Sequence, residues 1–201
     1  MSDHYYSSKP SSLSERSEIH AVLRGLSFKF VTDRGVFSRS EVDFGSALLA
    51  ESAFISPGDR LLDLGCGYGV VGIALANSVK DVELWSVDIN ERAVELCRMN
   101  AARVGIEAHV LESDGVAKIP SEIAFNCVVL NPPIRAGKST VWRLYAEAES
   151  VLLPHGELYV VIQKKQGARS STEYLRTLFH TVEVIANKSG YQVIQCVKMA
   201  T

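Results

Sequence analysis

Residues Leu61-Leu62-Asp63-Leu64-Gly65-Cys66-Gly67-Tyr68-Gly69 say more about the fold than any other part of this 201-residue chain. It starts as an apolar run that contains one acid, passes through three alternate glycines and ends where a helix-forming segment, Val70–Ser78, begins. Glycines permit a tight turn with positive φ and a close approach of the backbone to a ligand. Free N–H groups at the start of the helix favour polar or anionic ligand atoms. The sequence therefore predicts a strand, a glycine loop and a helix around a nucleotide-like molecule.

Two cofactor classes compete for this loop. The segment from Gly67 to Gly72 fits the dinucleotide fingerprint G-x-G-x-x-G, and Asp88 follows about 20 residues later, as in nicotinamide dehydrogenases. Asp63 favours the other class, because a carboxylate just before the first glycine would repel a pyrophosphate and attract a sulfonium with an ammonium group. The loop therefore indicates S-adenosylmethionine more strongly than a nicotinamide dinucleotide.

Acids after the next two expected strands extend this predicted site. Asp88 follows a strand over residues 82–87 and can accept hydrogen bonds from both hydroxyls of a ribose. Ile89 then provides an adenine wall, and Asn90 is expected to cap a helix. Asp114 could accept the adenine amino group, although Ser-Asp-Gly is also an ordinary turn sequence.

A second loop carries the predicted chemistry. Asn131-Pro132-Pro133 follows a buried strand over 125–130, and each proline fixes its own φ and restricts the residue before it. Asn131 Oδ1 and the Pro132 carbonyl could accept both N–H bonds of an exocyclic amine and aim its lone pair at a methyl group. Fixed acceptors of this kind stabilise developing charge without reorganisation. Such a transfer needs no metal and no strong base.

These two loops supply the predicted catalytic and cofactor-binding residues. The catalytic candidates are Asn131, Pro132 and Pro133. The cofactor-binding candidates are Asp63, Gly65, Gly67, Gly69, Asp88, Ile89, Asp114 and Asn131.

The chain resembles a known family at these residues. The glycine loop resembles that of class I methyltransferases, and Asn131-Pro132-Pro133-Ile134 resembles their amino-methylating turn. More narrowly, residues 28–38 (FKFVTDRGVFS), Asp43-Phe44-Gly45-Ser46 and residues 131–138 (NPPIRAGK) look like the catalytic domain of small-subunit ribosomal RNA guanine-N2 methyltransferases. The resemblance runs from about Tyr5 to the C-terminus.

This resemblance implies an S-adenosylmethionine-dependent enzyme that methylates guanine N2, with ribosomal RNA or the small ribosomal subunit as its partner. It places Phe37 and Ser38 along the substrate site, where Phe37 stacks on the base or contacts the methionine portion of the cofactor; a core position in the hairpin is the other interpretation of Phe37. Two departures stand out: Ile134 occupies a position where many members have an aromatic residue, and the second, degenerate methyltransferase-like domain of some members is not found in this chain.

Charge adds a prediction about the substrate. The net charge of −2 argues against nucleic-acid binding by overall charge. Basic residues nevertheless gather in two acid-free windows, 123–146 and 158–172, where they follow the ends of the expected strands 125–130 and 157–162. A basic rim there could grip phosphates, although an ordinary solvated surface explains it equally well. The predicted substrate-binding residues are Phe37, Ser38, Ile134, Arg135, Lys138 and Lys164.

Composition limits the remaining possibilities. The start is polar and no apolar run reaches about 18 residues, so neither a signal peptide nor a membrane span is expected. Four scattered cysteines without a C-x-x-C pair are typical of reduced structural thiols in a cytoplasmic protein, and no metal site is predicted.

The alternation of strands and helices predicts an α/β fold, namely a Rossmann-like, mostly parallel seven-stranded sheet with one antiparallel strand, as in class I methyltransferases. We expect one domain over 1–201, with an N-terminal arm and hairpin in 1–44 and the core in 45–201. Residues 1–12 are expected to be mobile, 14–25 to form a short helix or extended arm, and 26–32 to form a hairpin with a return strand starting at 36–37. The expected core helices are 43–54, 70–78, 91–103, 139–152 and 172–179, and its expected strands are 60–64, 82–87, 108–112, 125–130, 157–162, 182–186 and 191–197.

Three alternatives remain open from the sequence. The amine could belong to an adenine N6 or to a protein glutamine instead of guanine. The chain could be a nicotinamide dehydrogenase, which the terminal hairpin, Asp63 and the proline turn disfavour. It could also be a non-catalytic cofactor-binding or assembly protein.

Overall fold

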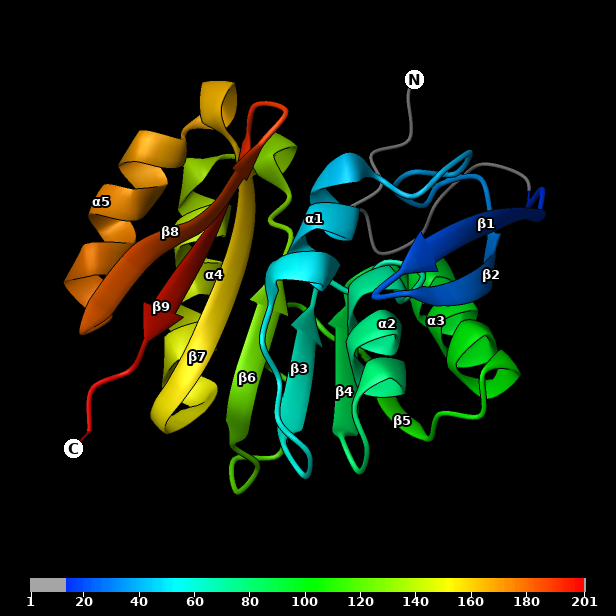
Figure 1. The fold of residues 1–201 in the computed structure, drawn as a ribbon, viewed down its shortest axis with the longest axis horizontal. Helices are drawn as coiled ribbons and strands as arrows, with labels where there is room; N and C mark the ends of the chain where they lie inside the picture. Colours follow the sequence, from blue (N-terminus) through cyan, green and yellow to red (C-terminus); the bar gives the residue numbers. More distant parts are fainter. Residues whose placement is uncertain (1–13, 201) are drawn as a thin grey trace.

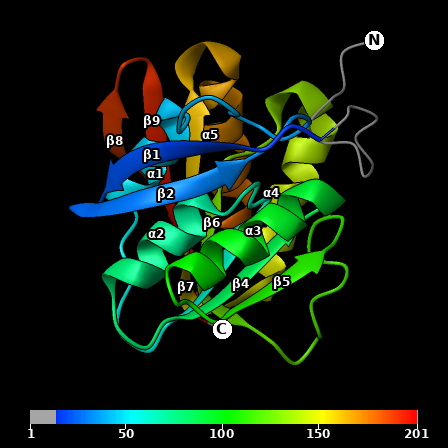
Figure 2. The ribbon, with the colours of Figure 1, turned by 90° about the vertical axis from the view of Figure 1, so that its right-hand side faces the viewer.

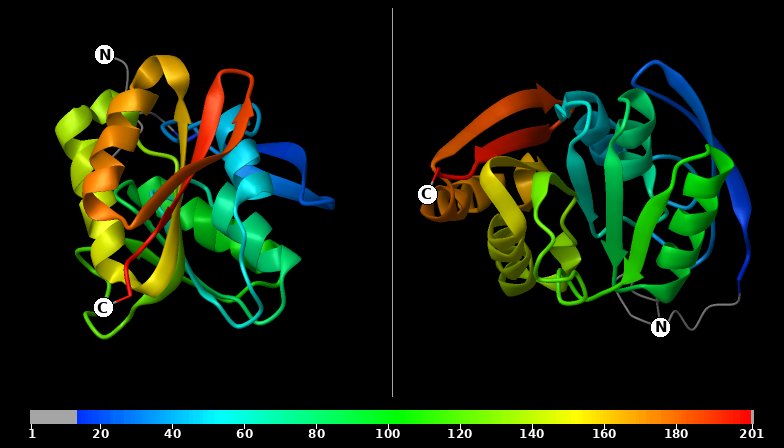
Figure 3. Two further views of the ribbon diagram at one scale, coloured as in Figure 1. Left: turned by 60° about the vertical axis from the view of Figure 1, so that its left-hand side comes forward. Right: turned by 90° about the horizontal axis from the view of Figure 1, so that it is seen from below.

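The computed structural model describes residues 14–200, so the expected mobile segment 1–12 lies outside the described residues. A central sheet lies between two layers of helices, and a separate hairpin lies beside the layer that contains α2 and α3 (Figure 1). The views from the side and from below show the same layering (Figures 2 and 3).

Within these residues, seven strands form the central sheet in the order β5-β4-β3-β6-β7-β9-β8. Only β9 runs antiparallel to its neighbours, so the predicted sheet with one antiparallel strand is confirmed for the described part of the chain. Ser189 and Gly190, with φ of 50° and 80°, form the turn between β8 and β9. Two positive φ values are typical of a two-residue hairpin turn. The strands are β3 Arg60–Leu64, β4 Glu83–Asp88, β5 Ala108–Glu112, β6 Phe125–Leu130, β7 Leu152–Gln163, β8 Thr181–Lys188 and β9 Tyr191–Val197.

The N-terminal hairpin exists, but its predicted partners were wrong. β2 (Leu26–Thr32) pairs with β1 (Ser17–Leu23), which was expected to be a helix or an arm, and residues 36–37 form no strand. The reason is the turn between them, because Arg24 and Gly25 have φ of 52° and 75° and close a two-residue hairpin. The segment after β2 is therefore free to run toward the end of the sheet.

Side chains of β3 alternate between the two helical layers. Leu61 packs with α1, α2, α3 and the hairpin in one apolar cluster, whereas Leu62 and Leu64 pack with α4 and α5 in the other. Both faces of the sheet are therefore buried, as expected for parallel strands. The helices are α1 Phe44–Ser52, α2 Val70–Ser78, α3 Glu91–Arg103, α4 Lys138–Val151 and α5 Ala168–Leu178, with short 3₁₀ segments η1 Ile134–Ala136 and η2 Lys164–Gln166.

The buried side chain of Asn100 on α3 joins the hairpin to the glycine loop. Its Oδ1 accepts the Val31 N–H at 2.8 Å, and its Nδ2 donates to the carbonyls of Val31 and Tyr68 at 3.0 and 2.9 Å. Asn100 is 1% exposed, so water cannot easily replace these bonds. One amide thus fixes the hairpin relative to the loop that follows β3.

Asn100→Ala should therefore lower the free energy of unfolding by roughly 3 kcal/mol, because it leaves several buried backbone groups without partners. Urea denaturation followed by circular dichroism measures this change. Asn77→Ala, the same substitution at an exposed position of α2, is the control and should change stability by less than about 0.5 kcal/mol. Equal stability of both variants would mean that the Asn100 bonds contribute little.

Candidate active site

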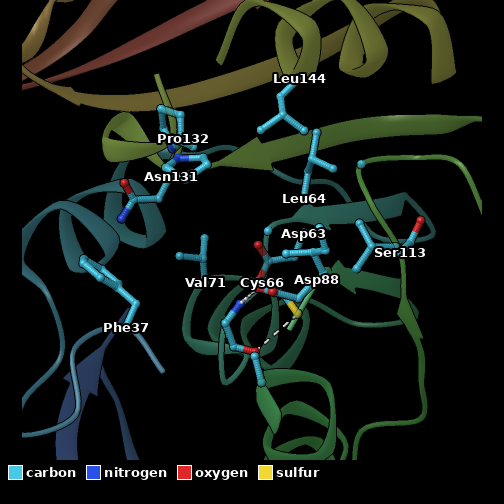
Figure 4. Close-up of a pocket in the computed structure, with 18 of the residues that line it drawn as sticks. Phe37, Asp63, Leu64, Cys66, Val71, Asp88, Ser113, Asn131, Pro132 and Leu144 are labelled. Atoms are coloured by element: carbon cyan, nitrogen blue, oxygen red, sulfur yellow. Dashed lines mark hydrogen bonds between the residues drawn. The ribbon is translucent and has the colours of Figure 1, made fainter. Parts of the chain in front are cut away.

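A cavity of about 390 Å³ opens where β3, β4, β5 and β6 end (Figure 4). The carboxyl ends of parallel strands meet at one edge of a sheet, and ligands of α/β proteins bind in the crevice there. The volume lies within the range of small-molecule sites, which is about 300–1,000 Å³. Of the residues predicted from sequence, the cavity is lined by Phe37, Ser38, Asp63, Gly65, Gly67, Asp88, Ile89, Asp114, Asn131, Pro132 and Pro133.

The glycine loop leaves room above its backbone. The N–H groups of Gly65 and Cys66 both donate to the Val87 carbonyl at 2.8 and 2.9 Å, which ties the loop to the end of β4. Gly65 and Gly67 have φ of 76° and 55°, and no atom lies within 4 Å of a Cβ built on either. Positive φ together with open space is what close approach of a ligand requires.

Gly69 has a different role from the other two glycines. It does not line the cavity, and a Cβ there would lie 2.6 Å from Ile73 Cδ1 and 2.8 Å from Cys97 Sγ. Gly69 caps the start of α2 with φ of 95°. The structure therefore assigns it to packing between α2 and α3, and its predicted place among the cofactor contacts is not supported by the geometry.

Asp63 combines burial with a single backbone donor. It is 4% exposed, lines the cavity and accepts the Gly72 N–H at 2.8 Å through Oδ2. Burial raises the pKa of Asp63 to about 7, and the nearby Asp88 carboxylate raises it further, against the effect of the Gly72 N–H. A carboxyl group in this state favours a cationic ligand, which would restore its charged form.

Asp88 is held by backbone groups at both carboxylate oxygens. Oδ2 accepts the Gly67 N–H at 2.8 Å and Oδ1 accepts the Asn90 N–H at 2.9 Å. Burial raises the pKa of Asp88, although these N–H groups oppose the shift. The carboxylate orientation is thus fixed, and each oxygen keeps acceptor capacity toward the cavity. Ile89 lines the cavity beside it, as predicted.

Asp114 reaches the cavity but is already paired. Its Oδ1 accepts from Arg143 Nη2 at 2.6 Å, and Arg143 Nη1 also donates to Glu147 at 2.6 Å. Gly115 is required here, because a Cβ would lie 1.8 Å from Glu147 Oε2. The sequence places Arg143 in a basic window, whereas the structure places it in the cavity wall. An adenine amino group would have to use the second oxygen of Asp114.

The Asn131 side chain is oriented by residues on α1. Its Nδ2 donates to Asp43 Oδ2 at 3.2 Å and to Ser46 Oγ at 3.0 Å. Within the described part of the chain, no donor is recorded for Asn131 Oδ1. Asn131 lines the cavity beside Pro132 (Figure 4), so Oδ1 is the acceptor that a ligand could use.

Sequence reasoning gave Asp43 and Ser46 no role. They are the two ends of the family-like motif Asp43-Phe44-Gly45-Ser46. The signal that could have found them is the capping pattern, since Asp43 is the N-cap of α1 and accepts the Ser46 N–H at 2.9 Å. Nothing in the linear pattern shows that the same group reaches the proline turn.

One of the two predicted acceptors of the proline turn already accepts a hydrogen bond within the protein. The Ile134 N–H donates to the Pro132 carbonyl at 2.9 Å across Pro133, whose φ and ψ are −75° and 78°. This is an inverse γ-turn. The Pro132 carbonyl therefore keeps one lone pair for a substrate. Ile134 turns toward the apolar cluster of α4 and α5 and does not line the cavity, so the geometry does not support its predicted contact with substrate.

Phe37 and Ser38 lie at the cavity as predicted. Phe37 is 37% exposed, and Ser38 adopts φ of 56° while its carbonyl accepts a weak bond from the Tyr68 hydroxyl at 3.4 Å. Because the hairpin ends at Thr32, this segment reaches the ligand edge as a loop. The interpretation of Phe37 as a buried hairpin aromatic is therefore wrong.

The predicted basic residues lie outside the cavity wall. Arg135 is on η1, Lys138 opens α4 and Lys164 opens η2, all on segments that follow β6 or β7. Lys138 Nζ lies 4.2 Å from the centre of the Trp142 ring, which stacks on Tyr174 with centroids 4.4 Å apart. Trp142 therefore positions one cation of this rim.

Two further properties concern the described residues as a whole. Among residues 14–200, no group of three or more histidine, cysteine or acidic side chains is arranged to hold a metal ion. No helix in that range is both long and apolar enough to cross a membrane.

The sequence profile of the Methyltransferase small domain family matches residues 27–195. The chain belongs to this family. It is 45% identical to the uncharacterized protein YbxB of Bacillus subtilis over 202 residues, which covers 99% of this chain and 100% of the relative. It is 33% identical over 171 residues to ribosomal RNA small subunit methyltransferase C of Stutzerimonas stutzeri, covering 82% of this chain and 49% of the relative.

A solved structure shows the same methyltransferase fold. The 16S rRNA N2 G1207 methyltransferase (RsmC) of T. thermophilus, in complex with AdoMet and guanosine, matches with a TM-score of 0.83 and 25% identity. The match covers 94% of this chain and 52% of that chain. The chain thus spans about half the length of the two ribosomal RNA methyltransferases that it matches. These similarities exclude the nicotinamide dehydrogenase interpretation.

The cofactor of this methyltransferase is S-adenosylmethionine, and the cavity suits it. Gly65 and Gly67 leave open space for a ligand, Asp88 presents fixed acceptors for ribose hydroxyls, and Asp63 offers a carboxyl group to a cation. When bound, the cofactor supplies an electrophilic methyl group on a sulfonium.

The pKa of Asp63 leads to a prediction about pH. Because its folded pKa of about 7 lies above the ordinary value of 3.8, the free protein carries a protonated Asp63 below that pH. A bound cation favours the carboxylate, so affinity for S-adenosylmethionine should rise as pH increases toward 7, by up to about tenfold per unit, with release of a proton. Calorimetry in buffers of different ionisation enthalpy, from about pH 5.5 to 7, measures both quantities.

Asp63→Asn keeps the shape and the acceptor for Gly72, so it should weaken binding and flatten the pH dependence. Asp59→Asn, at a turn aspartate before β3, is the matched control and should leave both unchanged. Identical pH profiles for wild type and Asp63→Asn would assign the dependence to Asp88 instead.

Proposed function

We propose that this methyltransferase transfers a methyl group to an exocyclic amine, and that the substrate is guanine N2 of small-subunit ribosomal RNA in the cytoplasm. The observation that carries the proposal is the Asn131 amide, whose donor end is occupied by α1 and whose Oδ1 remains as an acceptor at the cavity. An acceptor held in this way suits a planar amino group that must release its lone pair.

The chain's own residues would act through position and charge. Asn131 Oδ1 and the remaining lone pair of the Pro132 carbonyl accept the two N–H bonds of the amine, which directs the nitrogen lone pair toward the methyl group. As the new bond forms, the nitrogen becomes positive, and these fixed acceptors stabilise it more than the neutral amine. The excess proton can leave to water afterwards, so no strong base is needed.

Guanine is favoured over other amines by the relatives. RsmC of T. thermophilus was solved with guanosine, and its fold covers 94% of this chain. A base in a folded RNA must leave its stack to enter such a cavity. Phe37, half-exposed at the cavity wall, is our candidate for stacking on it, because Ile134 faces the other way.

The test is nucleoside analysis of ribosomal RNA from cells with and without this protein. The proposal expects N2-methylguanosine to fall by one residue per small subunit, and purified protein to restore it in small subunits or 16S RNA from the deletion strain. Loss of N6-methyladenosine would instead identify adenine N6 as the substrate. Methylation of a protein glutamine, detected by peptide mass spectrometry, would identify a protein substrate. Cofactor binding without transfer to either material would indicate a non-catalytic protein.

Asn131→Ala should lower the single-turnover rate of methyl transfer by on the order of a hundredfold, as for loss of one fixed charge-stabilising group. The affinity for S-adenosylmethionine should change little, because the adenosine contacts come from the loops after β3, β4 and β5. Asn126→Ala, near the opposite end of β6, is the control for the same chemical change. A near-normal rate in Asn131→Ala would mean that the turn is structural.

The basic rim can be tested by salt dependence. If Lys138 and Lys164 contact phosphates, replacing both by alanine should reduce the slope of log affinity against log salt by roughly 1.5 units. The control replaces Lys29 and Lys80, exposed lysines of the hairpin and of the loop after α2, and should leave the slope as in wild type. Equal slopes for all three proteins would mean that Lys138 and Lys164 do not contact phosphates and belong to an ordinary solvated surface.

A further inference from the structure

One carboxylate oxygen at the start of α1 serves both the helix and the proline turn. Asp43 Oδ2 accepts the Ser46 N–H at 2.9 Å, which caps the helix, and it also accepts Asn131 Nδ2 at 3.2 Å. Ser46 Oγ contacts the same Nδ2 at 3.0 Å. The two ends of the segment Asp43–Ser46 therefore converge on one amide nitrogen, 85 to 88 residues away in sequence.

The chemistry of this contact determines which way the amide faces. An ionised carboxylate can only accept hydrogen bonds, whereas an amide has a donor end and an acceptor end. Rotating the Asn131 amide by half a turn would place its oxygen against the Asp43 oxygen and lose the Asp43 bond, although the Ser46 hydroxyl could then donate to that oxygen. Oδ1 is therefore left as the acceptor at the cavity, which is the atom that an amine substrate needs.

The surroundings of Asp43 keep the carboxylate in this place. A Cβ on Gly45 would lie 3.0 Å from Asp43 Oδ2 and 3.1 Å from Tyr191 Cε1, so a side chain at that position would press on both. The Phe44 ring packs against Tyr191 with centroids 5.5 Å apart. A helix cap alone would not require this confinement, since serine and asparagine cap helices about as well as aspartate.

We propose that Asp43 is a positioning residue for methyl transfer, because it sets the orientation of the Asn131 amide and polarises it toward the substrate. A hydrogen bond from Nδ2 to a charged acceptor increases the electron density on Oδ1 and strengthens the bond that Oδ1 accepts. That bond matters most as the substrate nitrogen becomes cationic, so the effect falls on the rate of transfer. The inference rests on the proposed amine chemistry of this site.

Three substitutions separate the cap from the positioning role. Asp43→Ser keeps a capping oxygen for Ser46 N–H but is too short to hold Asn131, so the single-turnover rate should fall roughly ten- to hundredfold, the range for a hydrogen bond to a charged group. Asp43→Asn can place its own oxygen where Oδ2 lies and should recover part of the rate, because it restores the orientation of the Asn131 amide but not the charge. Asp43→Ala loses both functions and should also lower the melting temperature by about 2–4 °C.

The kinetic parameters distinguish a positioning role of Asp43 from a loss of protein stability. In Asp43→Ser, kcat should fall while the KM for S-adenosylmethionine and the melting temperature stay near wild type. In an Asn131→Ala background, Asp43→Ser should cause no further loss, because Asp43 acts only through Asn131. Asp59→Ser, at a turn aspartate that accepts the Ser56 N–H, is the matched control and should be fully active. Additive losses at positions 43 and 131 would overturn the proposal.

A second measurement needs no substrate, so it separates failure of this inference from failure of the proposed function. In nitrogen–proton NMR spectra, the side-chain NH₂ pair of Asn131, identified by its absence in Asn131→Ala, should exchange slowly with water in wild type and Asp43→Asn. It should exchange faster in Asp43→Ser. Unchanged exchange in Asp43→Ser would overturn the positioning role whether or not the protein methylates RNA. Slow exchange without any transfer to RNA would leave the geometry intact and remove the proposed substrate.

Discussion

The organisation of this protein depends on two carboxyl groups at the end of an apolar sheet, where Asp63 is buried and Asp88 is partly exposed to the cavity. Asp63 and Asp88 lie at or near the ends of adjacent parallel strands, and backbone N–H groups of Gly72, Gly67 and Asn90 hold them. Burial raises the pKa of both, and the Asp88 carboxylate raises the pKa of Asp63 further. A cationic cofactor removes that conflict, whereas an anionic dinucleotide would deepen it. The same glycine spacing can therefore serve either class, and the acid before the first glycine decides which.

The two halves of the cavity are built by different means. The cofactor half consists of loops fixed by backbone hydrogen bonds, such as the Val87 carbonyl that accepts from Gly65 and Cys66. The substrate half depends on side chains, where Asn131 is oriented by Asp43 and Ser46 from a helix on the other side of the turn. Backbone contacts keep the shape of these loops without depending on side-chain identity, whereas Asp63 and Asp88 add the carboxyl groups that a cation needs. Side-chain contacts can change with the substrate, which fits a family whose members act on different targets.

Local patterns predicted most of the sheet, because its central strands β3 and β6 are mainly apolar runs directly followed by Gly65 and Asn131. The helices at 70–78 and 91–103 and the strands at 108–112 and 125–130 have the predicted bounds. The hairpin is present as predicted, but its pairing was wrong because a strand over 17–23 has mixed polarity and becomes recognisable only through its partner. Ile134 and Gly69 do not line the cavity, which a linear motif cannot show because it does not say how a residue packs. Asp43 was overlooked because its partner lies 88 residues away.

Contacts between residues that are distant in sequence also place the segment after the hairpin at the site. Asn90 caps α3 through Oδ1, and its Nδ2 donates to the Gly35 carbonyl at 2.9 Å, two residues before Phe37. Asn100 fixes β2 from the same helix. Phe37 is thus placed at the cavity by α3, the helix that follows Asp88. Under the proposed function, Phe37 can take the stacking role of an aromatic residue after the prolines, since its ring already lies at the cavity on a segment anchored to α3. A change in α3 should consequently disturb substrate and cofactor together, whereas a change in α1 should disturb substrate alone.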